Sequence, residues 1–455
     1  MPLRLLAALA VLFLFAACSP DEGQGTTSSP GPATTIASAT TDTVGPSTTP
    51  PTTAPGTTLP PGTEELPEEI RVELAELIEI TQNVRDLEFV EQPNVVVVNN
   101  DELAQRVREQ LAEDLEDLPA DEALYRLLGL IEDDTDLEQL YSDLYSEQVA
   151  GYYDGEEGEL VVPRAEEGFT ALQRATLVHE LTHALTDQHY EFHDSYSALI
   201  DADRFDEAAA FQALIEGDAV LTEFQYLQGL TAEEQAQFFQ ESFGVDQEVF
   251  QAAPRFIRDA LIFPYDSGYL FVDRLYRSGS FDAVAEAYAA PPTSTEQIID
   301  PEDYPADQPI ELEAVDLTLD GYELEYQATW GELGFALMFD QVLTTDVSDT
   351  AAGGWGGDSY QVHFDGTDVV LVLRYRGDSA ADGEELAGTL RDYVESAMDT
   401  GEAVDFEDGT AFQGEDSAWL WNSGADVIFV ASSSDDAFTG AVEAVLPETT
   451  DTTAG

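Results

Sequence analysis

Residues 170–187 read TALQRATLVHELTHALTD, and this segment determines how the rest of the chain is interpreted. Thr170 and Gln173 have the spacing of a capping box, which predicts a helix that starts here. His179 and His183 are four residues apart and therefore share one face of that helix, about 6 Å from each other. Val178, Leu181 and Leu185 form an apolar stripe beside them. We therefore expect the two imidazoles at the edge of a core.

Two imidazoles in this arrangement can bind one Zn²⁺ ion at about 2.0–2.1 Å each. Glu180 lies one position along the helix, where its carboxylate can reach a water molecule at the metal, as the HExxH spacing requires. The chain has only 5 histidines, so a chance occurrence of this motif is rare. The competing interpretation is a structural helix with coincidental histidines. We predict a zinc hydrolase site with Glu180 as the catalytic base.

A zinc hydrolase needs a third protein ligand and an open fourth position. His189 and His193 would not share the helix face of the first pair. The residues from Phe205 to Leu227 show helical spacing, and Glu216 has apolar neighbours one and two turns away. A carboxylate in such a stripe is costly unless it meets a cation, so we predict Glu216 as the third ligand. Glu207, near the start of the same helix, is the alternative.

The segment from His179 to Asp187 resembles the active-site helix of thermolysin-like zinc peptidases, the gluzincins. Residues 70–305 are similar to a family of bacterial HExxH proteins, often exported. The shared segments are GYYD (151–154), HALTDQ (183–188), EGDA (216–219), FPY (263–265) and PTSTEQI (292–298). The resemblance implies a zincin-like metallopeptidase whose site is completed by a glutamate on a following helix. Thermolysin has an aspartate four residues after that glutamate, but Val220 stands here. Asp218 or Asp206 is therefore the candidate carboxylate that hydrogen-bonds His179 behind the metal.

The reaction also needs a donor for the oxyanion of the transition state. Tyr265, Tyr153 and His189 are the candidates, although each also fits a structural role. The hairpin expected at 148–162 offers an edge strand for an extended peptide substrate. Two other functions fit the motif. One is a zinc amidase or esterase acting on cell-envelope material, and the other is a non-catalytic binding lipoprotein that retains its metal. An intact Glu180 argues against the second.

The chain as a whole is expected to have an α+β fold. Helical spacing at 66–90, at 101–145 and from Thr170 to about Ala289 predicts a mainly helical domain at 64–309. This domain also contains a short strand at Asn94–Val98 and the hairpin. Strand-like runs at 369–373 and 426–430, each followed by a helical pattern, predict a smaller α+β domain at 310–446. Residues 447–455 are expected to be a disordered tail.

The N-terminal segment is typical of an export signal. Arg4 precedes an apolar run from Leu5 to Ala17 that is too short to span a bilayer. It ends at Cys18 in a pattern that resembles the lipobox of bacterial lipoproteins, which implies a lipid on Cys18. Of the 45 residues at 19–63, 34 are Ser, Thr, Pro or Gly, a composition that predicts a disordered tether. We expect an exported protein, anchored by lipid to the outer face of the cytoplasmic membrane or cell envelope.

Charge excludes one class of partner. The 455 residues include 93 acidic and 16 basic side chains, which gives a formal net charge of −77. All the basic residues are arginines. Such a chain repels phosphate backbones, so no nucleic-acid partner is expected, and the expected partners are a peptide or protein substrate and the membrane. A single cysteine excludes intramolecular disulfides and thiolate-rich metal sites.

Overall fold

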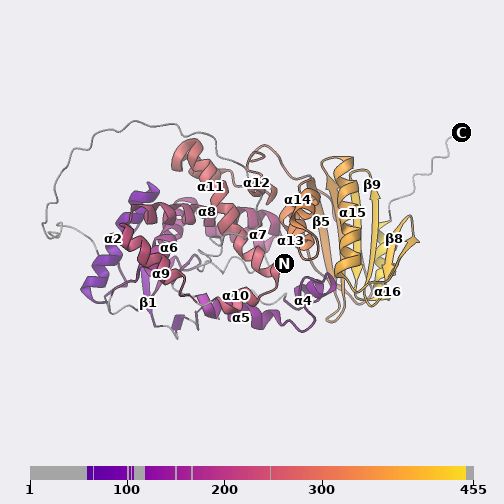
Figure 1. Cartoon of the computed structure of the whole chain (residues 1–455), viewed down its shortest axis with the longest axis horizontal. Coiled ribbons are helices and arrows are strands. Elements are labelled where there is room, and N and C mark those ends of the chain that lie inside the picture. The colour runs from indigo at the N-terminus through magenta and orange to yellow at the C-terminus, as the bar shows by residue number, and fades with distance from the viewer. Residues whose placement is uncertain are drawn as a thin grey trace, which may run out of the picture.

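The computed structural model describes residues 59–446, apart from 65, 100–101, 104, 107–117, 149–150, 165–167 and 246. It has a mixed α+β architecture, with a large helical part and a C-terminal antiparallel sheet at the opposite end of the molecule (Figure 1). The expected signal segment, Cys18 and the tail at 447–455 lie outside the described residues, as does the tether up to residue 58. No helix in the described part of the chain is long and apolar enough to cross a membrane.

The helical part contains a small sheet with strand order β1-β3-β2. β1 and β3 are parallel, whereas β2 and β3 form the expected hairpin. The strands are β1 (Asn94–Val98), β2 (Tyr152–Asp154) and β3 (Glu159–Pro163). The helices are α2 (Glu68–Arg85), α4 (Leu118–Leu127), α5 (Leu137–Gln148), α6 (Ala171–Tyr190), α7 (Phe192–Asp201), α8 (Phe205–Gly229), α9 (Ala232–Ser242), α10 (Glu248–Ala252), α11 (Arg255–Ala289) and α12 (Glu296–Ile299).

Helix α6 lies in the interior of the helical part. The predicted capping box is confirmed, because Thr170 accepts from the backbone N–H of Gln173 and the Gln173 side chain accepts from the backbone N–H of Thr170. The helix ends at Glu191, whose left-handed conformation (φ 50°) stops it. Nearly all of its side chains from Ala175 to Thr186 are buried, because other helices and the small sheet surround it. Polar groups on α6 are therefore held away from bulk solvent.

Helix α8 packs closely on both α6 and α11. Its first half is rich in alanine, and every side chain from Phe205 to Glu216 except that of Glu207 is buried. A Cβ atom at Gly217 would lie 2.2 Å from the carbonyl oxygen of Gly268 on α11, and one at Gly268 would lie 2.2 Å from that of Ala213. The two glycines therefore permit the close crossing of α8 and α11, which fixes the position of Glu216 next to Gly217.

The C-terminal part is a seven-stranded sheet with strand order β4-β5-β6-β10-β9-β8-β7, and all neighbours are antiparallel. The two strand-like runs seen in the sequence are β6 and β10. The strands are β4 (Glu323–Ala328), β5 (Trp355–Phe364), β6 (Val369–Gly377), β7 (Ala403–Phe406), β8 (Gly409–Gln413), β9 (Ser417–Ser423) and β10 (Asp426–Ser432). The helices are α13 (Gly331–Phe339), α14 (Thr345–Ala352), α15 (Ala380–Ala397) and α16 (Asp435–Val445).

The two parts share a hydrophobic core. One cluster of buried side chains runs from the helical part into the face of the sheet that α15 covers. Helix α4, although early in the chain, packs against β5 and β6. The hydroxyl of Tyr326 donates to Asp121 on α4 at 2.5 Å, and that of Tyr393 donates to the carbonyl of Leu128 at 2.5 Å. The sequence boundary near residue 310 therefore does not coincide with a break in packing.

Candidate metal centre

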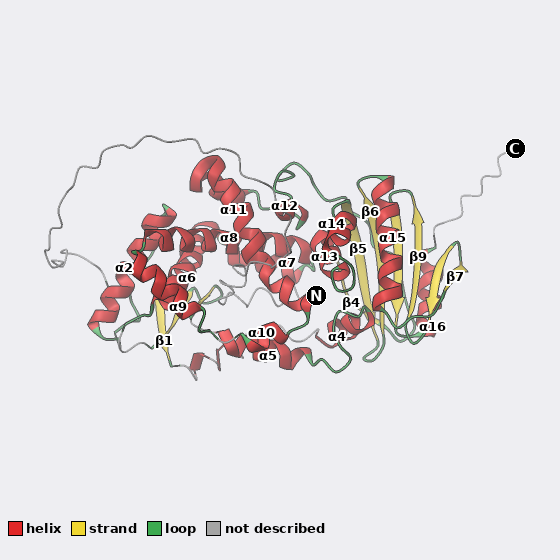
Figure 2. Cartoon of the chain, viewed as in Figure 1, coloured by secondary structure: helices red, strands yellow, loops and turns green. Residues whose placement is uncertain are grey.

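Helices α6 and α8 lie side by side in the helical part (Figure 2) and bring three side chains together. The Nε2 atoms of His179 and His183 are 3.0 Å apart. Oε2 of Glu216 lies 3.1 Å from Nε2 of His179 and 3.4 Å from Nε2 of His183. All three residues are buried. The structure thus places Glu216 beside the histidine pair, where the sequence argument expects the third ligand.

These distances fit a tetrahedral ion. Two ligand atoms that are each about 2.0–2.1 Å from zinc lie about 3.3 Å apart in tetrahedral geometry, and the three observed separations are 3.0, 3.1 and 3.4 Å. Among the described residues, this is the single group of three or more His, Cys, Asp or Glu side chains whose ligand atoms all lie within 4.8 Å of one another. Two imidazoles and one carboxylate are a donor set that suits zinc.

The electrostatics of the cluster favour a cation. Burial lowers the pKa of His179, but Glu216 and Glu223 raise it more strongly, to about 10. Burial raises the pKa of Glu216, but the two histidines lower it further, to about 2. The buried carboxylates therefore favour positive charge between α6 and α8, which a divalent ion would also supply.

Glu180 is held by the edge strand β2. Its Oε2 accepts a hydrogen bond of 2.9 Å from the backbone N–H of Tyr153. Burial raises the pKa of Glu180 to about 7, against the lowering effect of the two histidines. The side chain of Tyr153 points to a different partner, because its hydroxyl donates to Asp187 at 2.8 Å. Asp187 also accepts from the backbone N–H of His193, so Tyr153 ties β2 to the end of α6.

Glu223 is a further residue of the site, which the sequence argument missed. Its Oε2 lies 3.6 Å from Nδ1 of His179, and its side chain is 1% exposed. It follows Glu216 by seven residues, or two turns of α8, so the two carboxylates share one helix face. That spacing is the signal that could have identified it. Burial raises the pKa of Glu223, and His179 opposes this increase.

The other acids considered in the sequence are engaged elsewhere. Asp218 forms a buried ion pair with Arg85, with Nε and Oδ1 2.7 Å apart. Asp206 accepts from the hydroxyl and the backbone N–H of Thr295, at 2.5 and 3.2 Å. Of the three acids, Glu223 is thus the one that the structure places next to Nδ1 of His179, whereas Asp218 and Asp206 are paired with other residues. Glu207 is half-buried and pairs with Arg204, the residue that precedes α8, and not with the histidines.

The three candidate oxyanion donors differ in position. Tyr265, on α11, is buried, and its ring is stacked on that of His179 with centroids 6.3 Å apart. The hydroxyl of Tyr153 is bonded to Asp187, as described above. His189 lies on the exposed end of α6, where its Nε2 is 2.8 Å from the carbonyl oxygen of Glu88. Tyr265 is therefore the candidate whose ring adjoins the ligands.

One segment of the chain matches a known family model. A model described as a domain of unknown function, DUF8575, matches residues 321–443. This segment runs from β4 into α16 and does not include the cluster between α6 and α8. No curated protein matches the chain. No solved structure matches it either.

Proposed function

We propose that the chain is a zinc-dependent peptidase with a zincin-like catalytic part. The observation that carries this proposal is the convergence of His179, His183 and Glu216 on one point, with Glu180 on the same helix as the two histidines. Bound zinc would act as a Lewis acid on the scissile carbonyl and lower the pKa of an attacking water to about 7. In this proposal, His179, His183 and Glu216 hold the metal.

Residues of the chain itself transfer the proton. Glu180 takes a proton from the attacking water at its carboxylate and later gives it to the leaving amine. The backbone N–H of Tyr153 fixes the carboxylate through Oε2. We assign oxyanion stabilisation to Tyr265 because its ring adjoins His179. Since the ligands are buried, we expect flexible peptides and unfolded chains to be better substrates than folded proteins. A lipid on Cys18 and a tether at 19–58 would hold this activity at the outer face of a membrane.

The test is a zinc measurement combined with a peptidase assay on the chain lacking residues 1–18. Glu180→Gln should retain zinc and reduce cleavage of a quenched-fluorescent peptide library by 10²–10⁴, the usual loss for a general base. Glu233→Gln, at an exposed acid on α9, is the matched control and should behave as the wild type. Wild-type cleavage rates in Glu180→Gln, or full activity after zinc has been removed, would contradict the proposal. Muropeptide substrates in the same assay separate a peptidase from a cell-envelope amidase.

A further inference from the structure

The face of the C-terminal sheet opposite α15 is only partly covered. Helix α16 has 11 residues and is about 16 Å long, whereas the nine-residue strand β6 extends about 30 Å. Val370 and Val372 of β6 pack beneath α16. Arg374 and Arg376 continue the same face by the two-residue alternation of a strand, and they lie beyond the end of the helix.

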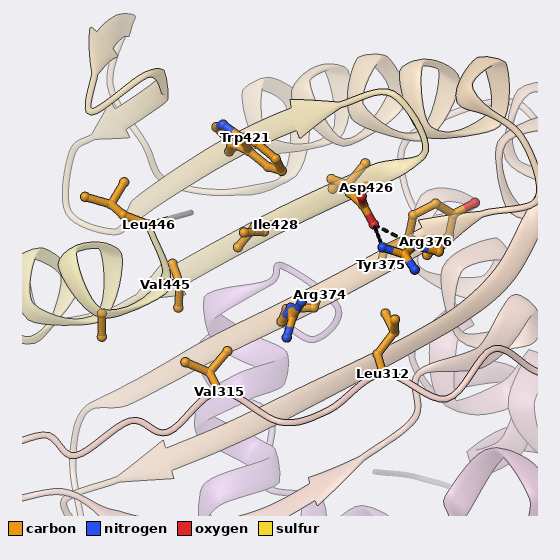
Figure 3. Close-up of a pocket in the computed structure, with 12 residues that line it drawn as sticks. Leu312, Val315, Arg374, Tyr375, Arg376, Trp421, Asp426, Ile428, Val445 and Leu446 are labelled. Atoms are coloured by element: carbon orange, nitrogen blue, oxygen red, sulfur yellow. Dashed lines mark hydrogen bonds and ion pairs between the residues drawn. The ribbon is translucent and has the colours of Figure 1, made fainter. Parts of the chain in front are cut away.

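A cavity of about 360 Å³ occupies this uncovered end (Figure 3). Its floor is formed by β6, β10 and β9, and one wall is the segment that precedes β4. Backbone hydrogen bonding between Ile310 and Gly356 fixes that segment on the sheet. The apolar residues that line the cavity include Leu312, Val315, Trp421, Ile428, Val445 and Leu446.

The two arginines of the cavity have different partners. Arg376 is paired with Asp426 across the β6–β10 ladder, with Nη2 and Oδ1 2.6 Å apart. Arg374 donates from Nη1 to the backbone carbonyl of Glu313 at 2.9 Å, and it forms no ion pair with any carboxylate of the described residues. A guanidinium has five N–H donors, so most of those of Arg374 remain available. Although the chain has 93 acidic residues, the positive charge of Arg374 is available to a ligand in the cavity.

We propose that this cavity binds a small amphipathic carboxylate, with the anionic group on Arg374 and the apolar body against Ile428 and Trp421. Guanidinium and carboxylate match in charge and geometry, and the remaining lining is apolar. At about 30 Å³ for each water-sized group, the cavity holds about a dozen such groups. β6 and β10 are both paired on their two sides, so no strand edge is open to an extended peptide. The proposal is independent of the metal centre.

Decanoate, with twelve non-hydrogen atoms, is the probe, and decanol is its neutral counterpart. Binding is measured by isothermal titration calorimetry in 0.15 M NaCl. This salt concentration reduces the effect of distant charges, because the Debye length is about 8 Å. We expect decanoate to bind the wild type about 10-fold or more tightly than decanol, as charge-assisted hydrogen bonds are strong. Arg374→Gln should abolish this difference. Arg391→Gln, at an exposed arginine on α15 with a single bond to Thr410, is the matched control and should preserve it.

A second variant fills the cavity without removing the charge. Ala444 is an exposed residue of α16 that lines the cavity, so Ala444→Trp should weaken decanoate and decanol alike while circular dichroism remains that of the wild type. If Arg374→Gln does not fold, Ala444→Trp alone tests whether the ligand binds in this cavity. Three results would overturn the proposal: no binding of decanoate at millimolar concentration, equal binding to Arg374→Gln and wild type, or unchanged binding to Ala444→Trp.

Discussion

The carboxylate of Glu223 lies 3.6 Å from Nδ1 of His179, while Nε2 of the same ring faces Glu216. Among the described residues, neither oxygen of Glu223 nor Nδ1 of His179 has a hydrogen-bond partner. A small shift of either side chain would let the Nδ1–H group of His179 donate to Glu223. With its proton on Nδ1, the ring keeps the lone pair of Nε2 free for a metal. A carboxylate behind a metal-binding histidine fixes the tautomer and the ring orientation in this way.

The first prediction follows from this contact. Glu223→Ala should weaken zinc binding by about 10–100-fold, the usual effect of losing such a partner, because His179 would lose the group that orients its ring. Competition with a fluorescent zinc chelator measures the dissociation constant. Glu233→Ala, at an exposed acid on α9, should leave the constant unchanged. A wild-type constant in Glu223→Ala would remove Glu223 from the site.

The second prediction separates the two candidate third ligands. Glu216→Ala should lower zinc occupancy sharply, since its Oε2 lies within 3.4 Å of both Nε2 atoms. Glu207→Ala should leave occupancy nearly unchanged, because Glu207 is paired with Arg204. Atomic emission on dialysed protein gives the ratio of zinc to chain. The opposite pattern would move the third ligand to Glu207.

The third prediction concerns the fold around the site. Arg85, at the end of α2, and Asp218 are 1% and 0% exposed, and the Arg85 guanidinium also lies 4.2 Å from the ring centroid of Phe281. Arg85→Met would leave Asp218 buried without its cationic partner and should lower the free energy of unfolding by about 3–5 kcal/mol. Urea denaturation measures this change.

A matched surface pair provides the control for Arg85. Arg376 and Asp426 are 42% and 44% exposed, so Arg376→Met should cost less than about 1 kcal/mol. The double variant Arg85→Met with Asp218→Leu should recover most of the loss, because no unpaired charge remains buried. Equal effects of the two single variants would show that the Arg85 pair behaves as a surface pair.

Features encoded locally could be predicted from the sequence, and features that depend on distant segments could not. The capping box at Thr170 and the strand Asn94–Val98 rest on neighbouring residues, and both occur where the pattern indicates. The position of Glu216 beside the histidines could be inferred from its apolar neighbours. Arg85 and Asp218, however, are 133 residues apart, and no local pattern connects them. Glu223 likewise comes close to His179 only when α8 packs on α6.

The fourth prediction concerns attachment to a membrane. If Cys18 carries a lipid, Cys18→Ser should move the protein from the membrane fraction to the soluble fraction, because the variant lacks the thiol to which the lipid would be attached. Immunoblotting of fractions washed with high salt measures the distribution. Ser19→Ala, at the next residue, is the control and should leave the protein in the membrane fraction. Retention of Cys18→Ser after the wash would point to a different anchor.

The fifth prediction is a loss of stability with rising pH, caused by buried acids near the junction of the two parts. Burial raises the pKa of Asp206 to about 7, that of Glu332 to about 7 and that of Glu296 to about 8. The folded chain therefore binds protons that the unfolded chain has already released between about pH 4 and pH 8. Stability falls with pH wherever the folded state holds more protons. The contribution is complete below about pH 4 and is lost as pH rises through 7 to 8.

We accordingly expect the melting temperature to fall by at least about 3 °C between pH 5 and pH 8, as measured by calorimetry on the zinc-free chain. General charge repulsion also lowers the melting temperature as pH rises, so two double variants are compared to separate the two causes. The double variant Glu296→Gln with Glu332→Gln should show a smaller decline, because an amide does not ionise. Glu384→Gln with Glu385→Gln, at two exposed acids of α15, removes the same charge and should leave the decline in place. Equal slopes in the two double variants would assign the pH dependence to net charge and not to the buried acids.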